Sequence, residues 1–126
     1  MRVIVCLACI LINTTVLFSQ PEVVFARTYG NEGNEHFMDI YYTSTDEYIA
    51  AGYHVDAIIA ENIDFYIVKV DLEGNIIWES TYDREGGADQ ANTIIETDER
   101  DFIAAGKCND SFSAIRINAG GEELWF

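Results

Sequence analysis

The chain has 126 residues, enough for one small domain, and its 49% hydrophobic content can supply a core. It carries 22 acidic and 7 basic residues, which gives a net charge of −15 at pH 7. This charge disfavours binding to nucleic acid or to an anionic membrane surface, and solubility is its simplest explanation. Divalent cations are the functional alternative, because hard cations take oxygen ligands.

The first twenty residues have the pattern of a secretory signal peptide. Arg2 precedes an apolar run from Val3 to Ile12, and a second apolar patch precedes Ser19 and Gln20. The run is too short to span a membrane comfortably, and small polar residues follow it. We therefore predict a signal peptide over residues 1–20 and a secreted, periplasmic or cell-surface location. An uncleaved anchor is the less favoured alternative.

The cysteines agree with this prediction. Cys6 and Cys9 lie in the leader, so Cys108 would stand alone in the mature chain. One Cys cannot form an internal disulfide, and packing must then stabilise the fold. A catalytic thiol needs a His and an acid close by, so we interpret Cys108 as a structural residue.

The rest of the chain contains an internal repeat. Residues 35–52 match residues 89–106 at an offset of 54, and both copies end in Ile-Ala-Ala-Gly. Residues 65–78 match residues 112–125 at an offset of 47, and both copies end in Trp. A loop that is seven residues longer in the first copy explains the change of offset. Units of about 50 residues are typical of propeller blades.

Each copy predicts four short strands, rich in β-branched and aromatic residues. We expect strands at Met38–Thr43, Glu47–Tyr53, Asp64–Asp71 and Asn75–Tyr82, and again at Asn92–Thr97, Asp101–Lys107, Ser111–Asn118 and from Glu122 onward. Glu73–Asn75 and Ala119–Gly121 predict tight turns, because Gly and Asn tolerate positive φ. Both third strands carry apolar residues on both faces instead of alternating apolar with polar ones. This pattern predicts burial of both faces. The fold class predicted is therefore all-β and propeller-like, with about two four-stranded antiparallel blades.

Residues 22–29 resemble a fourth strand without a blade before it. Phe25 aligns with Trp78, and Thr28-Tyr29 aligns with Thr81-Tyr82. The predicted organisation is an outer strand over 22–29, blade one over 35–82 and blade two over 89–126, which stops within its last strand. Two blades cannot close a ring of four to eight. The other blades would belong to a longer polypeptide, which we favour because of the exposed apolar edge, or to copies of this chain.

The repeat resembles a family of secreted bacterial and archaeal β-propeller proteins whose blades carry a TYGG…TSDGGYIVAG…DFYLIKLDSNGNVLW pattern. The matching residues are Thr28–Gly30, Thr43-Ser44, Tyr48–Gly52, Asp64–Asp71 and Gly74–Trp78. The second copy matches less closely, since Ser111 replaces the Asp. The resemblance implies an extracytoplasmic propeller of seven or eight blades, often attached to sorting or adhesion modules. It carries over no catalytic residues.

The two copies act as controls for each other. Residue types that recur at one place are predicted to be structural: Phe25 with Trp78 and Trp125, Gly52 with Gly106, Lys69 with Arg116, Asp71 with Asn118, and Glu35 with Asp89. Trp rings suit packing between blades, and the acids suit capping of turns.

Features unique to one copy are the better site candidates. They are His36 and the longer loop over residues 53–64, which holds His54, Asp56, Glu61 and Asp64. His and carboxylate side chains at this spacing predict a candidate site for a divalent cation or another ligand. A variable surface loop that carries these charges by chance is the simpler interpretation.

Two functional hypotheses follow. The first is a non-catalytic extracytoplasmic scaffold or recognition surface for a protein or glycan at the cell surface, by analogy with how propellers present loops. The alternative is part of a secreted propeller enzyme, a hydrolase or lyase acting on glycans. The chain has no G-x-S-x-G, H-E-x-x-H or P-loop motif, and no cofactor is predicted beyond the candidate divalent cation.

Overall fold

The computed structural model describes residues 26–30, 33–59, 62–84 and 86–126, so the predicted leader lies outside the described residues. The first sheet contains β1 (Asn34–Tyr42), β2 (Tyr48–Val55), β3 (Ile63–Val70) and β4 (Ile76–Tyr82). The second sheet contains β5 (Asp89–Glu96), β6 (Phe102–Cys108), β7 (Ser111–Ile117) and β8 (Glu123–Trp125). Every strand pairs antiparallel with the next one in its sheet. The prediction of an all-β chain with two four-stranded antiparallel sheets is confirmed.

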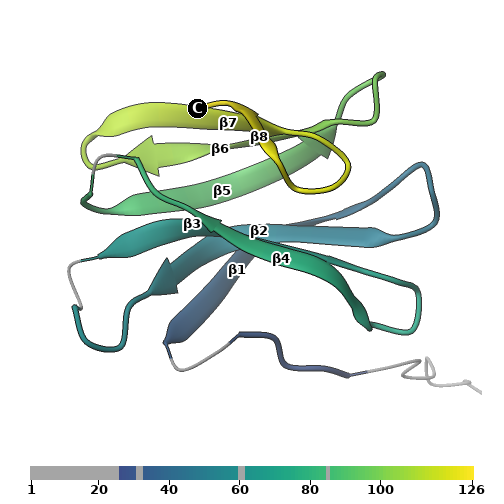
Figure 1. Ribbon diagram of the computed structural model, residues 1–126, viewed down its shortest axis with the longest axis horizontal. Coiled ribbons are helices and arrows are strands. Elements are labelled where there is room, and N and C mark those ends of the chain that lie inside the picture. Colours follow the sequence, from purple (N-terminus) through teal and green to yellow (C-terminus); the bar gives the residue numbers. More distant parts are fainter. Residues whose placement is uncertain (1–25, 31–32, 60–61, 85) are drawn as a thin grey trace, which may run out of the picture.

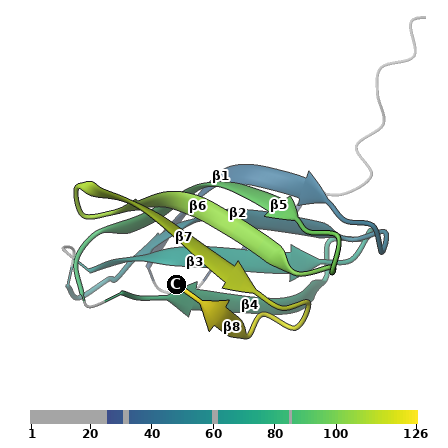
Figure 2. The same cartoon turned by 90° about the horizontal axis from the view of Figure 1, so that it is seen from above.

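The two sheets stack face to face, with β5 lying against β1, β2 and β3 (Figure 1). In Figure 2, β1 and β5 run along one edge of the stack, and β4 and β8 run along the opposite edge. The second sheet therefore repeats the first in the same orientation. Among the residues described, no helix has the length and apolarity needed to cross a membrane.

Both sheets contain the same irregularity between their first two strands. The register shifts between Phe37 and Asp39 in the first sheet, and at the equivalent place in the second. Gly52 and Gly106 face these shifts. A Cβ atom would lie 1.7 Å from the His36 carbonyl oxygen at Gly52, and it would meet the Gln90 carbonyl oxygen at 1.9 Å at Gly106. Close approach of two backbones explains why Gly recurs here.

The turns between the third and fourth strands are also alike. Gly74 and Gly121 have φ angles of 80° and 85°, as the turn prediction requires. Asp71 Oδ1 accepts a hydrogen bond from Asn75 N at 2.8 Å, and Asn118 Oδ1 accepts one from Glu122 N at 3.0 Å. A side-chain oxygen at this position therefore holds each turn.

The core fills the space between the sheets. The first sheet contributes Ile49, Ala51, Phe65, Ile67 and Tyr82, and the second contributes Ala91, Ile94, Phe102, Ala104, Ile115 and Ile117. The two sets are not repeat equivalents, since Ile49 corresponds to Ile103 rather than to Phe102. Opposite faces of the repeated unit meet, so the sheets pack head to tail.

Polar contacts join the sheets around this core. Asp39 Oδ2 accepts from Thr93 Oγ1 at 2.9 Å and from Ile94 N at 3.0 Å. Trp78 Nε1 donates to the Ala119 carbonyl oxygen at 3.0 Å, and the Trp78 ring lies against the turn at Gly121. Trp78 thus packs between the sheets.

Burial on both faces is correct for β3 and wrong for β7. Every β3 residue after Ile63 is buried, but Phe112 in β7 is 81% exposed. On the outer side of β3, Tyr29 packs against Val68 and Phe37 stacks on Tyr66. No described residue covers the outer side of β7 at Phe112 in this way.

The segment before β1 is only partly described. Residues 26–29 form no strand, and Phe25 lies outside the described residues, so its equivalence to Trp78 stays a prediction. Tyr29 Oη donates to the Gly74 carbonyl oxygen at 2.9 Å, and Tyr82 Oη donates to the Gly121 carbonyl oxygen at 2.6 Å. Tyr29 therefore occupies at the first sheet the position that Tyr82 occupies at the second.

Candidate functional site

A polar cavity of about 520 Å³ lies beside the loop between β2 and β3. It is lined by Gly33, Glu35, His54, Asp56, Ala57, Ile58, Asp64, Tyr66 and Thr81. The structure thus brings three of the predicted candidates, His54, Asp56 and Asp64, to one cavity. Glu61 lies outside the described residues, and His36 stacks on Tyr53 with ring centroids 4.8 Å apart.

His54 is paired with an acid from the neighbouring strand. Its Nδ1 atom lies 2.9 Å from Glu35 Oε1, because the register of β1 and β2 places these two residues opposite each other. Sequence comparison assigned Glu35 to a structural role through its match with Asp89. It missed the pair with His54, since cross-strand register is not visible in a linear pattern.

Asp56 holds the loop itself. Its Oδ1 atom accepts hydrogen bonds from Ile58 N at 2.6 Å and from Ile59 N at 2.9 Å. These backbone hydrogen bonds, led by the one from Ile59, lower the pKa of the Asp56 carboxyl. Asp56 is therefore an ionised loop cap whose acceptor capacity is already partly used.

Asp64 differs from both neighbours. It is buried on β3, its Oδ2 atom accepts from Asn62 Nδ2 at 3.3 Å, and its Oδ1 atom has no hydrogen-bond partner among the described residues. Burial raises the pKa of the Asp64 carboxyl, and the charges of Asp83 and Asp89 raise it further. A buried oxygen without a hydrogen-bond partner costs free energy in the folded state.

The cavity does not form a recognisable metal centre. Within the described ranges, no three His, Cys, Asp or Glu side chains are placed so that they could hold a metal ion. His54 is paired with Glu35, and Asp56 caps its loop. The divalent cation predicted from the sequence therefore stays a prediction.

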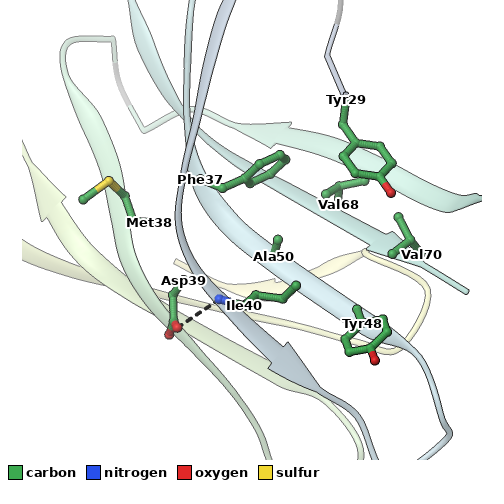
Figure 3. A pocket seen from close by; sticks show the side chains of 9 residues that line it. All are labelled: Tyr29, Phe37, Met38, Asp39, Ile40, Tyr48, Ala50, Val68 and Val70. Atoms are coloured by element: carbon green, nitrogen blue, oxygen red, sulfur yellow. Dashed lines mark hydrogen bonds between the residues drawn. The ribbon is translucent and has the colours of Figure 1, made fainter. Parts of the chain in front are cut away.

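An apolar cavity of about 400 Å³ lies on the outer face of the first sheet (Figure 3). Its lining residues are Tyr29, Phe37, Met38, Asp39, Ile40, Tyr48, Ala50, Val68 and Val70. Asp39 is the one carboxylic acid in this lining. The hydrogen bonds that its carboxylate accepts from the second sheet, chiefly the one from Ile94 N, lower its pKa. Sequence reasoning did not single out this face, because its residues come from four separate segments.

Comparison with known proteins assigns no family. No protein-family model matches the chain, and no curated protein matches it at a significant level. The resemblance to secreted propeller proteins stays a prediction based on the repeat.

Proposed function

We propose that the chain is a non-catalytic extracytoplasmic scaffold of propeller-type blades that recognises a protein or glycan at the cell surface. The observation that carries this proposal is the repeated docking contact, in which Tyr29 binds the turn of the first sheet as Tyr82 binds that of the second. A contact that recurs with the same atoms supports an array of radial sheets. Such an array presents its variable loops at a rim, where recognition takes place.

The polar cavity is the best candidate for the recognition surface. It lies at the loop in which the two copies differ most, so it is a feature that the scaffold does not require. His54, Asp56 and Asp64 give the cavity carboxylate and imidazole groups, and Thr81 adds a hydroxyl to the same wall. Carboxylate and hydroxyl side chains in a cavity of this kind suit the hydroxyl groups of a sugar.

The second candidate function is a glycan-cleaving enzyme that uses this cavity. The observation in its favour is a buried carboxyl, Asp64, with a raised pKa near other acids, which is a property of general acids. Against it, Glu35 and Asp56 already accept hydrogen bonds from His54 and from the loop backbone. Binding therefore fits the geometry better than catalysis.

A glycan array probed with the purified chain tests the proposal. We expect retention on a defined set of glycans, and Asp64→Ala, which changes the lining of the cavity, should weaken it at least about tenfold. Asp110→Ala, an exposed acid in the turn between β6 and β7, is the control and should bind like the wild type. Shortened glycans in the mass spectrum would support the enzyme instead. Equal binding by wild type and Asp64→Ala would remove the cavity from the proposal.

A further inference from the structure

The outer face of the first sheet is built like a face that is buried elsewhere in the molecule. We call it the entry face, and it consists of Phe37, Ile40, Tyr48, Ala50, Val68 and Val70. Their repeat equivalents in the second sheet are Ala91, Ile94, Phe102, Ala104, Ile115 and Ile117, which all lie in the core between the sheets. Ile40 is 64% exposed, whereas its equivalent Ile94 is 1% exposed. Tyr29 and Tyr48 pack against the buried Ala50, Val68 and Val70. No sheet among the described residues covers this face, and Phe37 and Ile40 are exposed on it.

The outer face of the second sheet is built like that covering sheet. We call it the exit face, and it consists of Ile103, Ala105, Phe112, Ala114 and Trp125. Phe102 and Ala104 point into the core, so the intervening residues of β6 point outward, and the same alternation applies to β7. The repeat equivalents of the exit face are Ile49, Ala51, Phe65, Ile67 and Trp78, which cover the second sheet. Phe112 is 81% exposed, and its equivalent Phe65 is fully buried.

The charged residues at the two faces also match the internal interface. Lys69 Nζ lies 5.6 Å from the centroid of the Phe102 ring, and Lys69 is held by Glu47. Arg116 is the repeat equivalent of Lys69 and is held by Asp101 at 2.8 Å. Tyr48 on the entry face is the equivalent of Phe102, so Arg116 of one copy can contact the Tyr48 ring of another.

The edges of β3 and β7 differ over the described residues. Along β3, pairing with β4 extends from Val70 to Phe65, which pairs with Tyr82. Along β7, pairing with β8 includes only Ile117 and Arg116. A cavity of about 440 Å³ lies beside the remaining part of β7, lined in part by Phe112, Ser113 and Ala114.

Tyr29 identifies the segment that matches this cavity. In the first sheet, Tyr82 ends the strand that pairs with β3 and donates to the turn of the next sheet. Tyr29 makes the equivalent hydrogen bond to the turn at Gly74, but residues 26–29 pair with no described strand. At the β3–β4 register, residues 27–29 would pair with Ala114, Ser113 and Phe112 of another sheet.

We propose that two copies of this chain associate head to tail, with the exit face of one copy packed on the entry face of the next. In this contact, residues 26–29 of the second copy add to the β7 edge of the first. The contact is heterologous, so successive copies form a closed ring or a longer array according to the angle between sheets. The inference rests on the blade-type stacking that the proposed function also uses, but it does not depend on a glycan ligand.

Sedimentation velocity with two charge-introducing variants tests this contact. The wild type should associate as its concentration is raised to about 1 mM, the weak end of specific binding. Ile40→Asp disables the entry face and Phe112→Asp the exit face, so each variant alone should sediment as a monomer. An equimolar mixture should form a dimer, because one intact face of each kind remains. Ile59→Asp, at a loop residue that is 60% exposed and lines neither cavity, should associate like the wild type.

Circular dichroism and thermal unfolding of each variant check that the sheets are intact. On association of the wild type, amide hydrogen exchange at residues 112–114 should slow by at least about tenfold, as expected for new strand pairing. A wild type that stays monomeric up to about 1 mM would overturn the inference, and it would leave the glycan-array result unaffected. A wild-type oligomer whose two variants fail to complement each other would indicate a symmetric contact and would also overturn it.

Discussion

At the scale of single residues, two carboxyl groups show how position decides the effect of a charge. Asp39 joins the two sheets through hydrogen bonds from Thr93 and Ile94, and its pKa is lowered. Asp64 lies buried with one oxygen that has no described partner, and its pKa is raised. The ionised form is therefore favoured by folding at Asp39 and disfavoured at Asp64.

The first prediction concerns Asp64→Asn. At pH 7 this change should increase the free energy of unfolding by on the order of 1 kcal/mol, because it removes a buried charge. A carboxyl whose pKa is raised in the folded state costs stability above that pKa, so the gain should shrink as the pH falls through the raised pKa. Urea unfolding followed by tryptophan fluorescence between about pH 4 and about pH 7 measures the difference in the free energy of unfolding.

Asp39→Asn is the matched comparison with the opposite sign. Its stability contribution is present above the pKa of the unfolded chain and is lost as the pH falls through the lowered folded-state pKa. The variant should therefore be less stable than the wild type at pH 7 and approach it in acid. A loss of stability in Asp64→Asn at neutral pH would contradict the cost assigned to the buried Asp64 carboxylate.

At the scale of elements, the first pair of strands in each sheet depends on one glycine. Gly52 faces Phe37 and Gly106 faces Ala91, where the partner strand shifts its register. Neither glycine has a positive φ, so their requirement is space rather than backbone conformation. The nearest atoms are carbonyl oxygens of the partner strand, which cannot move without breaking the ladder.

The second prediction is that Gly52→Ala and Gly106→Ala each destabilise the chain by about 2–3 kcal/mol, the cost of forcing extra volume into a packed site. Gly120→Ala is the control, since its nearest neighbour for a new Cβ atom is Asn118 Oδ1 at 3.4 Å and its φ is not positive. It should change the stability by about 0.5 kcal/mol or less. Thermal unfolding of the three variants decides the point, and equal midpoints would contradict the close approach of the strands.

At the scale of the whole molecule, apolar faces and net charge act against each other. The entry and exit faces favour association by burial, while the net charge of −15 makes copies repel one another. The lining of the apolar cavity contains one acid, Asp39, and that carboxylate is already bound by the second sheet. The repulsion therefore arises mainly outside the contact.

The third prediction is that salt strengthens the head-to-tail association. The Debye screening length falls from about 10 Å at 0.1 M salt to about 3 Å at 1 M. Electrostatic repulsion between copies therefore falls, while the burial of apolar surface is unchanged. The apparent dissociation constant from sedimentation should fall by at least about tenfold over this range. Association that weakens with salt would mean that ion pairs between copies carry the contact instead of the two faces.

The strands, the turns and the two four-stranded sheets could be predicted from the sequence alone. Their signals are local: β-branched and aromatic runs form each strand, Gly74 and Gly121 allow the positive φ of a turn, and the repeat shows each pattern twice. The expected boundaries of the eight blade strands lie within four residues of the observed ones. The outer strand expected over 22–29 is not a strand over residues 26–29, the part that the structure describes. Of the residues singled out in the longer loop, His54, Asp56 and Asp64 line one cavity, and their role as a site stays a prediction.

Contacts between residues far apart in the chain were decided only by the tertiary structure. Register places Glu35 beside His54, and stacking of the sheets places Asp39 on Thr93 and leaves Phe112 exposed. The periodicity of a strand says which residues share a face, but not which face is covered or by what. Burial depends on the neighbouring sheet, and that neighbour is determined by packing in three dimensions.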